Sequence, residues 1–241
     1  MKKFLLVAAA ILISTVTSFA KDIKLDPGLT QDMFKSATKE LGVALAFNPM
    51  SPAEPLGITG FDAAAEVIVT EINDDKDYWK LTFKNGDTIP TIPTARIHLQ
   101  KGLPFNIDVG AMYSSVPSTD IKLWGVEVKY AILEGGITMP AISIRGAFSK
   151  LEGIDEIDVN TYSGDLMISK GFLFLTPYAG ITMLRVNASE NSDLVTLDDV
   201  HETIYRGLLG LQVSPLPLLN ITVEASIGEV KQYGLKLGLR F

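Results

Sequence analysis

Twelve ionisable side chains fall at alternate positions of apolar segments, and their types and spacing make them the first candidates for chemistry. Alternate residues of a strand face the same side, so all twelve are predicted to share one face of a sheet. The six acids and six bases are Asp62, Glu66, Asp108, Glu127, Asp165, Glu224, Arg96, Lys129, Arg145, Arg206, Lys236 and Arg240. Charges confined in a medium of low dielectric must pair or stay hydrated, and equal numbers favour pairing.

The balance of signs also bears on transport, because an ion-selective pore would show an excess of one sign. The sequence therefore predicts a paired network that holds a barrel together, with a narrow polar channel as the alternative. His98 shares this face. We interpret it as a satisfied buried histidine, since a catalytic role needs partners that cannot be placed. The sequence contains neither a cluster with metal-ligand spacing nor a Gly-rich phosphate loop, so no metal and no cofactor are expected.

Two short acidic motifs form a second candidate site. Asp75-Lys76-Asp77 and Asp199-Val200-His201 both fall where strands are predicted to end on the side of the longer loops. Paired carboxylates with an Asp–His pair can activate a water for peptide hydrolysis. The arrangement resembles that of the omptin surface proteases, which are also ten-stranded, and it implies a surface hydrolase as an alternative function. The resemblance is confined to these motifs.

Strands must position these residues, because apolar and polar residues alternate along most of the chain. The pattern predicts ten strands, at 58–72, 92–100, 103–114, 121–133, 139–149, 157–168, 171–185, 201–213, 217–227 and 231–241. Most are longer than the ~5–6 residues usual in soluble proteins. They match the ~9–11 residues that a tilted strand needs to cross a bilayer. Pro177 lies within a predicted strand, cannot donate to a ladder, and predicts a bulge or a local gap in the wall.

The connections between these segments alternate between short turns and longer loops, as in outer-membrane barrels. An even number of strands puts both barrel termini on the periplasmic side. Residues 73–91 could hold an extra hairpin, because Tyr78 to Phe83 alternates and Asn85-Gly86 is a hairpin turn signal. Twelve strands are therefore an alternative to ten.

The predicted fold is an all-β, transmembrane, antiparallel up-and-down barrel over residues 57–241. The alternative is a soluble periplasmic barrel that binds a ligand and turns its apolar face inward. The chain has no Cys, which excludes a disulfide framework, a thiolate metal site and a Cys nucleophile. Its formal net charge of −7 argues against nucleic acid as a partner.

Residues 1–20 have the pattern of a secretory signal peptide. Met1-Lys2-Lys3 is basic, Phe4 to Ile13 is apolar, and Ser18-Phe19-Ala20 ends in small residues, so cleavage is expected after Ala20. An exported chain without Cys is typical of a bacterial protein.

Residues 21–56 differ from the rest of the chain. Thr30 can cap a helix that runs to about Leu41, and Gly42 follows it. Pro49, Pro52 and Pro55 then enforce an extended linker. A helix is ~10–12 Å across with its side chains, so it can partly plug the lumen or cover its periplasmic mouth. The alternative is a loosely held N-terminal arm.

The last strand carries a resemblance to a known class. Tyr233, Leu235, Leu237, Leu239 and Phe241 alternate up to the final residue. This pattern resembles the C-terminal signal strand of bacterial outer-membrane proteins, and it implies recognition by the barrel assembly machinery and contact with outer-membrane lipid in a Gram-negative envelope.

Two further runs, residues 95–105 and 175–180, resemble a family of uncharacterised outer-membrane barrels. That likeness covers most of the mature chain and implies no known activity. The predicted function is an integral outer-membrane barrel of unknown substrate, either structural or a narrow passive channel or transporter for small molecules.

Deleting Phe241 should reduce outer-membrane insertion in cells far more than it lowers the stability of protein refolded in detergent. The reason is that an assembly signal acts during insertion and adds little to the finished barrel. Membrane fractionation and detergent unfolding measure the two effects, and normal insertion of the deleted form would contradict the assembly role.

Overall fold

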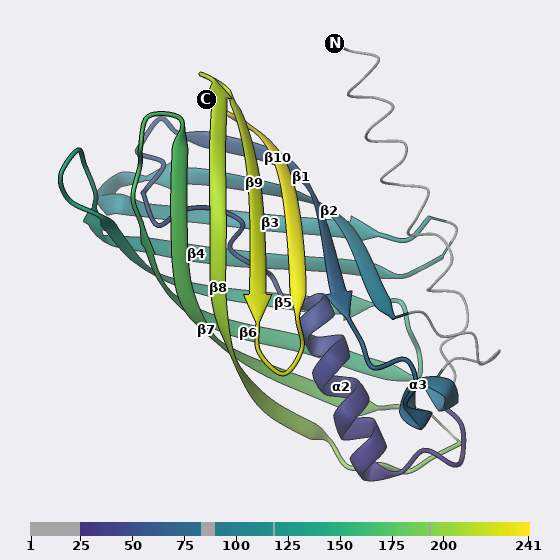
Figure 1. The fold of residues 1–241 in the computed structure, drawn as a ribbon. Coiled ribbons are helices and arrows are strands. Elements are labelled where there is room, and N and C mark those ends of the chain that lie inside the picture. Colours follow the sequence, from purple (N-terminus) through teal and green to yellow (C-terminus); the bar gives the residue numbers. More distant parts are fainter. Residues whose placement is uncertain (1–24, 83–89, 118, 193) are drawn as a thin grey trace.

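The structure is a computed structural model that describes residues 25–82, 90–117, 119–192 and 194–241 of the 241-residue chain. A closed barrel takes up most of them, and a helix and an extended segment precede its first strand (Figure 1). The predicted signal peptide lies outside the described residues. Among the described helices, none is both long and apolar enough to cross a bilayer.

Ten antiparallel strands form the barrel, and consecutive strands are neighbours. Their bounds are β1 Phe61–Glu71, β2 Thr91–Leu103, β3 Ile107–Ser115, β4 Lys122–Glu134, β5 Ala141–Glu152, β6 Ile157–Ser169, β7 Leu175–Glu190, β8 Val200–Leu216, β9 Leu219–Ile227 and β10 Gln232–Arg240. Strand β10 pairs with β1 and closes the ring, and Phe61 and Phe241 exchange backbone hydrogen bonds of 3.0 and 2.8 Å. The predicted fold class, an all-β antiparallel barrel, is confirmed.

The outer face of the barrel is apolar along the middle of the strands. The inner positions that alternate with it are buried and mostly polar. A soluble barrel has the reverse arrangement, so that alternative is excluded. A closed ladder with an apolar outer face meets the requirements of a bilayer. Apolar residues of the alternation point outward: Val126, Val128, Val223 and Leu235 are 48 to 51% exposed, and Ile221 and Leu237 are partly exposed.

The two ends of the barrel differ. One end, called here the turn end, carries the short turns at residues 104–106, 135–140, 170–174 and 217–218, the start of β1 and the end of β10. The opposite end, called the loop end, carries the remaining connections, among them those between β1 and β2 and between β7 and β8. The connections between β1 and β2 and between β7 and β8 are long, as predicted, whereas those at residues 153–156 and 228–231 are as short as the turns of the opposite end.

Helix α3 (Asp77–Thr82) occupies part of the connection between β1 and β2, where the alternation predicted a possible extra hairpin. Tyr78 and Trp79 both hydrogen-bond to Glu40. Neighbouring residues of a strand face opposite sides and could not share a partner in this way. The prediction of a strand here is therefore wrong, and its turn signal at residues 85–86 lies outside the described residues.

Helix α2 spans Gln31–Leu45, and the Thr30 hydroxyl caps it by accepting a backbone N–H of the first turn at 3.4 Å. It runs past the predicted end at Leu41. Gly42 lies inside the helix, where an added Cβ would stand 2.3 Å from Cγ2 of Val186 on β7. The glycine therefore permits close approach of the helix to the wall and does not end the helix.

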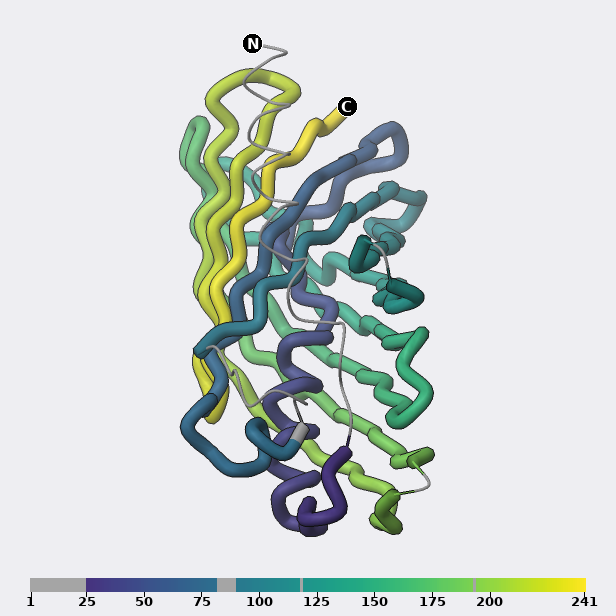
Figure 2. The backbone as a smooth tube through the Cα atoms, turned by 90° about the vertical axis from the view of Figure 1, so that its right-hand side faces the viewer, coloured from purple at the N-terminus to yellow at the C-terminus, as the bar shows by residue number. Residues whose placement is uncertain are grey.

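Helix α2 lies at the loop end, inside the ring of strands (Figures 1 and 2). The chain then runs through the barrel interior to the start of β1 at the turn end (Figure 2). The helix therefore does not cover the mouth that the strand parity assigns to the periplasm, because the segment after it spans the lumen.

Pro177 does not interrupt the barrel wall, contrary to the prediction. The register of β7 with β8 runs from Leu175 to Ala188 without a shift. The pairing of β7 with β6 begins only at Tyr178. Pro177 therefore lies at the edge of the ladder, where its missing N–H costs no hydrogen bond. The predicted bulge or gap at this residue is wrong.

Gly42→Ala should destabilise the folded barrel by about 1–3 kcal/mol, because the added methyl overpacks against Val186. Val186→Ala removes the methyl groups that collide, so the double variant should recover most of the loss. Urea unfolding in detergent micelles of the parent, both single variants and the double variant measures the coupling. A loss that Val186→Ala leaves unchanged would contradict the close contact.

Candidate functional site: the filled lumen

The lumen is filled by residues 45–56, called here the lumen segment. Leu45 to Ala53 are buried without interruption, and Ala46, Met50 and Ala53 have no exposed surface. Pro49 and Pro52 fall within this run and keep it extended. A buried backbone needs partners for its N–H and C=O groups, so the wall of the barrel must supply them.

Basic side chains of the wall donate to carbonyl oxygens of the lumen segment. Arg96 Nη1 lies 3.1 Å from the oxygen of Ala46, and Arg145 Nη2 lies 2.7 Å from that of Phe47. Lys129 Nζ donates to the carbonyls of residues 52 and 54, at 3.1 and 3.0 Å. Three of the predicted charges therefore hold the backbone of the segment.

Acidic and hydroxyl side chains accept the N–H groups of the same segment. The amide of Met50 donates to Glu224 Oε2 at 3.0 Å. The amide of residue 53 donates to Ser169 Oγ at 3.1 Å, and that of residue 56 reaches both oxygens of Asp108 at 3.1 and 3.2 Å. Met50 fits over Gly234 of β10, where a Cβ would lie 2.5 Å from its sulfur.

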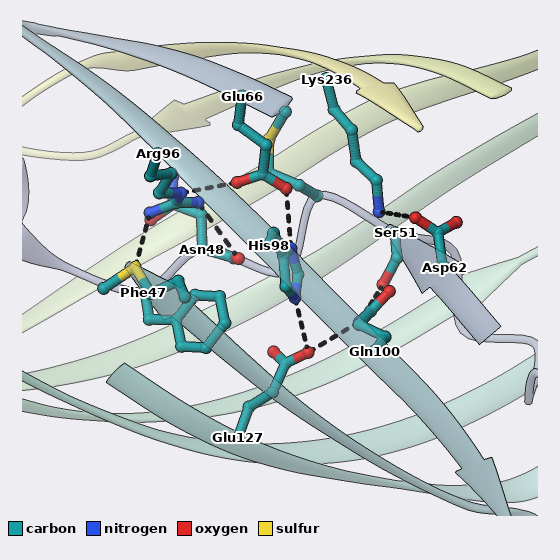
Figure 3. A network of polar contacts seen from close by, with 12 residues as sticks. Phe47, Asn48, Ser51, Asp62, Glu66, Arg96, His98, Gln100, Glu127 and Lys236 are labelled. Atoms are coloured by element: carbon teal, nitrogen blue, oxygen red, sulfur yellow. Dashed lines mark hydrogen bonds and ion pairs between the residues drawn. The ribbon is translucent and has the colours of Figure 1, made fainter. Parts of the chain in front are cut away.

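His98 joins two carboxylates across the wall (Figure 3). Its Nδ1 lies 2.7 Å from Glu66 Oε1 and its Nε2 lies 3.0 Å from Glu127 Oε1. Only the doubly protonated ring can donate to both carboxylates. Arg96 Nε binds the other oxygen of Glu66 at 2.6 Å, and Arg145 Nε binds the other oxygen of Glu127.

Phe47 of the lumen segment packs beside Arg96 and His98 (Figure 3) and also contacts Arg145. The guanidinium carbons of Arg96 and Arg145 lie 5.4 and 5.0 Å from its ring centre. The His98 ring meets it edge-on, at 4.8 Å between centroids. Cations over an aromatic face are attracted by its quadrupole, so Phe47 ties the lumen segment to the charge network.

The remaining predicted charges also lie on the inner wall. Asp62 pairs with Lys236 and Arg240, each at 3.2 Å. Two further ion pairs join Lys129 to Asp108 at 3.1 Å and Arg145 to Asp165 at 2.5 Å. Paired charges of both signs leave the wall without an excess of one sign.

Arg206 and Glu224 differ from the other predicted charges. Within the described residues, neither has an oppositely charged group within 4.0 Å. Arg206 donates to Gln232 at 3.0 Å, and Glu224 accepts from the Tyr178 hydroxyl at 2.7 Å. Strands β8 and β9 therefore form the side of the lumen where Arg206 and Glu224 are held by hydrogen bonds to uncharged groups and have no direct ion pair.

Glu40 holds helix α2 in place at the loop end of the lumen. This buried carboxylate of α2 accepts hydrogen bonds from Asn73 N at 3.0 Å, Asn73 Nδ2 at 2.6 Å, the Tyr78 hydroxyl at 2.8 Å and Trp79 Nε1 at 2.5 Å. Burial, together with the hydrogen bond to Glu40, raises the pKa of Tyr78 to about 12. The carboxylate thereby joins α2 to α3 across the mouth.

Further contacts hold the first half of α2 to the loop end. Gln31 and Asp198 exchange hydrogen bonds of 3.0 and 2.9 Å. Lys35 and Lys39 pair with Glu202 at 3.0 and 3.5 Å. These groups are more exposed than those of the lumen, so each contributes modestly.

The two rim motifs predicted as a hydrolytic site are not joined in the structure. Asp77 pairs with Lys80 of its own helix at 3.5 Å. His201 is exposed and its Nδ1 lies 2.8 Å from Asn187 Oδ1. No hydrogen bond or ion pair within the described residues links the two motifs, and no three metal-binding side chains gather there or elsewhere in that part of the chain.

Sequence reasoning missed the uncharged polar side chains that bind the lumen segment and the end of helix α2. Asn48 donates to Gln232 at 2.7 Å, and Gln232 donates to the carbonyl of Val43 at 2.8 Å. Ser149 donates to the carbonyl of Leu45 at 2.8 Å. A usable signal existed, because Ser149 and Gln232 fall at inner positions of the same alternation as the charges.

Comparison with known proteins identifies the family. Residues 57–241 match DUF6588, a family of unknown function. The chain belongs to this family. The match covers all ten strands and begins just after the lumen segment. No protein of curated function matches the chain significantly.

Solved barrels are similar at low identity. The attachment invasion locus protein Ail of Yersinia pestis is 14% identical, over 76% of this chain and 97% of its own, with a TM-score of 0.32. KdgM porin, in complex with disordered oligogalacturonate, is 10% identical over 76% and 99%, with a TM-score of 0.36. The translocator domain of the autotransporter NalP from Neisseria meningitidis is 14% identical over 87% and 95%, with a TM-score of 0.37. Similarity at this level transfers no activity.

The contact of Tyr78 with Glu40 should be lost in alkali. Because the pKa of Tyr78 is about 12 when folded and ~10 when unfolded, its stabilising effect is complete below pH ~10 and disappears as the pH rises through 12. Trp79 fluorescence in a Trp124→Phe background reports the change. Glu40→Gln should move the midpoint towards 10, whereas Tyr78→Phe should abolish the transition; an unchanged transition in Tyr78→Phe would assign it to another group.

Proposed function

We propose that this protein is an outer-membrane barrel, exported by its signal peptide, that its own N-terminal segment closes in the resting state. The observation that carries the proposal is the uninterrupted burial of Leu45 to Ala53 within the closed ring. A lumen occupied by backbone, with that backbone bonded to opposite walls, has no room for an open passage. The barrel is then a gated conduit for small polar solutes.

The contacts of the lumen segment support a seal that can be released. They are mostly hydrogen bonds from side chains of the wall to backbone atoms, and the groups on both sides can be rehydrated if the segment leaves. The wall would then present both signs of charge to water, which suits a narrow polar channel of low ion selectivity. A permanently filled structural barrel is the second candidate, favoured by the many buried ion pairs.

The path of the chain supports an outward-facing cap. Leu25 belongs to the apolar cluster at the loop end, and Asp26 N donates to the carbonyl of Leu81 in α3 at 3.2 Å. The N-terminal part of the described chain therefore lies at the loop end, which is external if the barrel termini are periplasmic.

The C-terminal strand supports assembly by the outer-membrane machinery. Phe241 is 62% exposed, while its backbone completes the ladder with Phe61. Tyr233, Leu235 and Leu239 are also exposed on the outer face. A terminal strand that presents an apolar row outward is what the predicted signal requires.

Single-channel recording in a planar bilayer tests the gate. The parent protein should be silent. Phe47→Ala with Met50→Ala loosens the lumen segment without changing the wall, and a loss of about 3 kcal/mol or more should raise the open fraction by about a hundredfold.

A tether supplies the control, because the chain has no native Cys. Ala53→Cys with Ser169→Cys replaces a contact of 3.1 Å between the segment and β6. Added to the loosened variant, this pair should abolish the openings when oxidised and restore them when reduced. A steadily open parent would refute closure, and a silent loosened variant would favour the structural barrel.

A further inference from the structure

The turns at the turn end expose large apolar side chains at their tips. Phe105, in the turn between β2 and β3, is 85% exposed. Ile137, between β4 and β5, and Leu173, between β6 and β7, are almost completely exposed, at 99 and 104%. Turns that project into water usually carry Gly, Pro, Asn, Asp or Ser, so these residues need another explanation.

The three tips belong to a larger apolar surface, called here the turn ring. Leu103 and Ile132 lie between these tips and the apolar outer face of the strands. Its members besides the three tips are Ile58, Met139, Phe172, Phe174, Leu216, Leu218 and Phe241.

The backbone at two tips makes this choice of residues more unusual. Phe105 has a φ of 66° and Leu173 a φ of 54°. This left-handed region favours Gly or Asn and disfavours residues with a large side chain. Large side chains at these two positions therefore have an unfavourable backbone conformation. Burial of the side chains in an apolar environment would offset that cost.

Lysines supply hydrogen bonds that water would otherwise provide. Lys170 Nζ donates to the carbonyls of Gly136, Ile137 and Met139 at 2.7, 2.8 and 3.1 Å. Lys101 Nζ donates to the carbonyls of residues 58 and 60 at 2.7 and 3.1 Å. Backbone groups in lipid must be satisfied by the protein itself, whereas turns in water have no such need.

Charge distinguishes the two ends as well. Apart from the inner wall and the lumen segment, the described turn end carries Lys101 and Lys170 against Glu134. The loop end is acidic, and the acids in its described connections include Asp74, Asp75, Asp155, Glu156, Asp198 and Asp199. A basic, apolar surface complements the headgroups and acyl chains of anionic phospholipid.

We propose that the turn ring is immersed in the phospholipid leaflet on the periplasmic side, so that Phe105, Ile137 and Leu173 anchor the barrel in lipid. The leaflet is continuous with the lipid around the strands, and Lys101 and Lys170 lie at the level of its headgroups. This inference rests on the proposed membrane location and adds the depth at which the barrel is held.

Spin labelling of the full-length chain tests the immersion, since the absence of native Cys allows one label per variant. The labels are placed at Ile137→Cys and Leu173→Cys in vesicles that contain phosphatidylglycerol. Val128→Cys on the outer face is the lipid control, and Leu194→Cys, at an exposed leucine between β7 and β8, is the aqueous control. Collision with oxygen reports lipid, and collision with a water-soluble nickel chelate reports water.

The labels at 137 and 173 should resemble the label at 128, with nickel collision at least several-fold below that at 194. If 137 and 173 match 194 while 128 remains in lipid, the immersion is wrong and the turn ring faces water or a soluble partner. If 128 also collides with nickel, the membrane location itself fails. Lys170→Gln should raise the nickel collision at 137, because three turn carbonyls then lose their donor and become hydrated.

Discussion

The need to give every buried charge an ion pair or hydrogen bonds governs this barrel. A wall with six acids and six bases facing inward encloses charges that are almost all buried, and an isolated buried charge costs several kcal/mol. Ion pairs between neighbouring strands meet part of this need. The backbone of the lumen segment meets much of the rest, since its carbonyls accept from Arg96, Arg145 and Lys129 and its amides donate to Glu224 and Asp108.

The composition of the lumen segment fits that constraint. Proline lacks an N–H, so Pro49 and Pro52 reduce the number of donors that the wall must satisfy. Phe47 supplies an aromatic face to two guanidinium groups and an edge contact to His98. Small residues elsewhere let the segment and its helix approach the wall, as at Gly42 and Gly234. The lumen segment is thus complementary to a polar wall, whereas the core of a soluble protein is mostly apolar.

The two ends of the barrel differ in polarity, as do its polar inner face and its apolar outer face. At the loop end, Glu40 gathers donors from α3 and its preceding loop, and acidic loops face outward. At the turn end, apolar tips extend the outer surface, and lysines satisfy the turn carbonyls. A barrel with one acidic end and one apolar end has a preferred direction across a bilayer.

Sequence by itself determined the strands, the inner and outer faces and the closing of the barrel. The reason is that side chains alternate between the two faces along each strand, and this pattern can be read without knowing any tertiary contact. It placed all twelve charges on one face for the same reason. It mistook Tyr78 and Trp79 for part of a strand and ended α2 at Leu41, since short alternation and a lone glycine have several structural causes. Only the tertiary structure decided what fills the lumen. Met50 meets Glu224 across 174 positions of sequence and residue 56 meets Asp108 across 52, and contacts over such separations depend on how the closed ring brings its walls together.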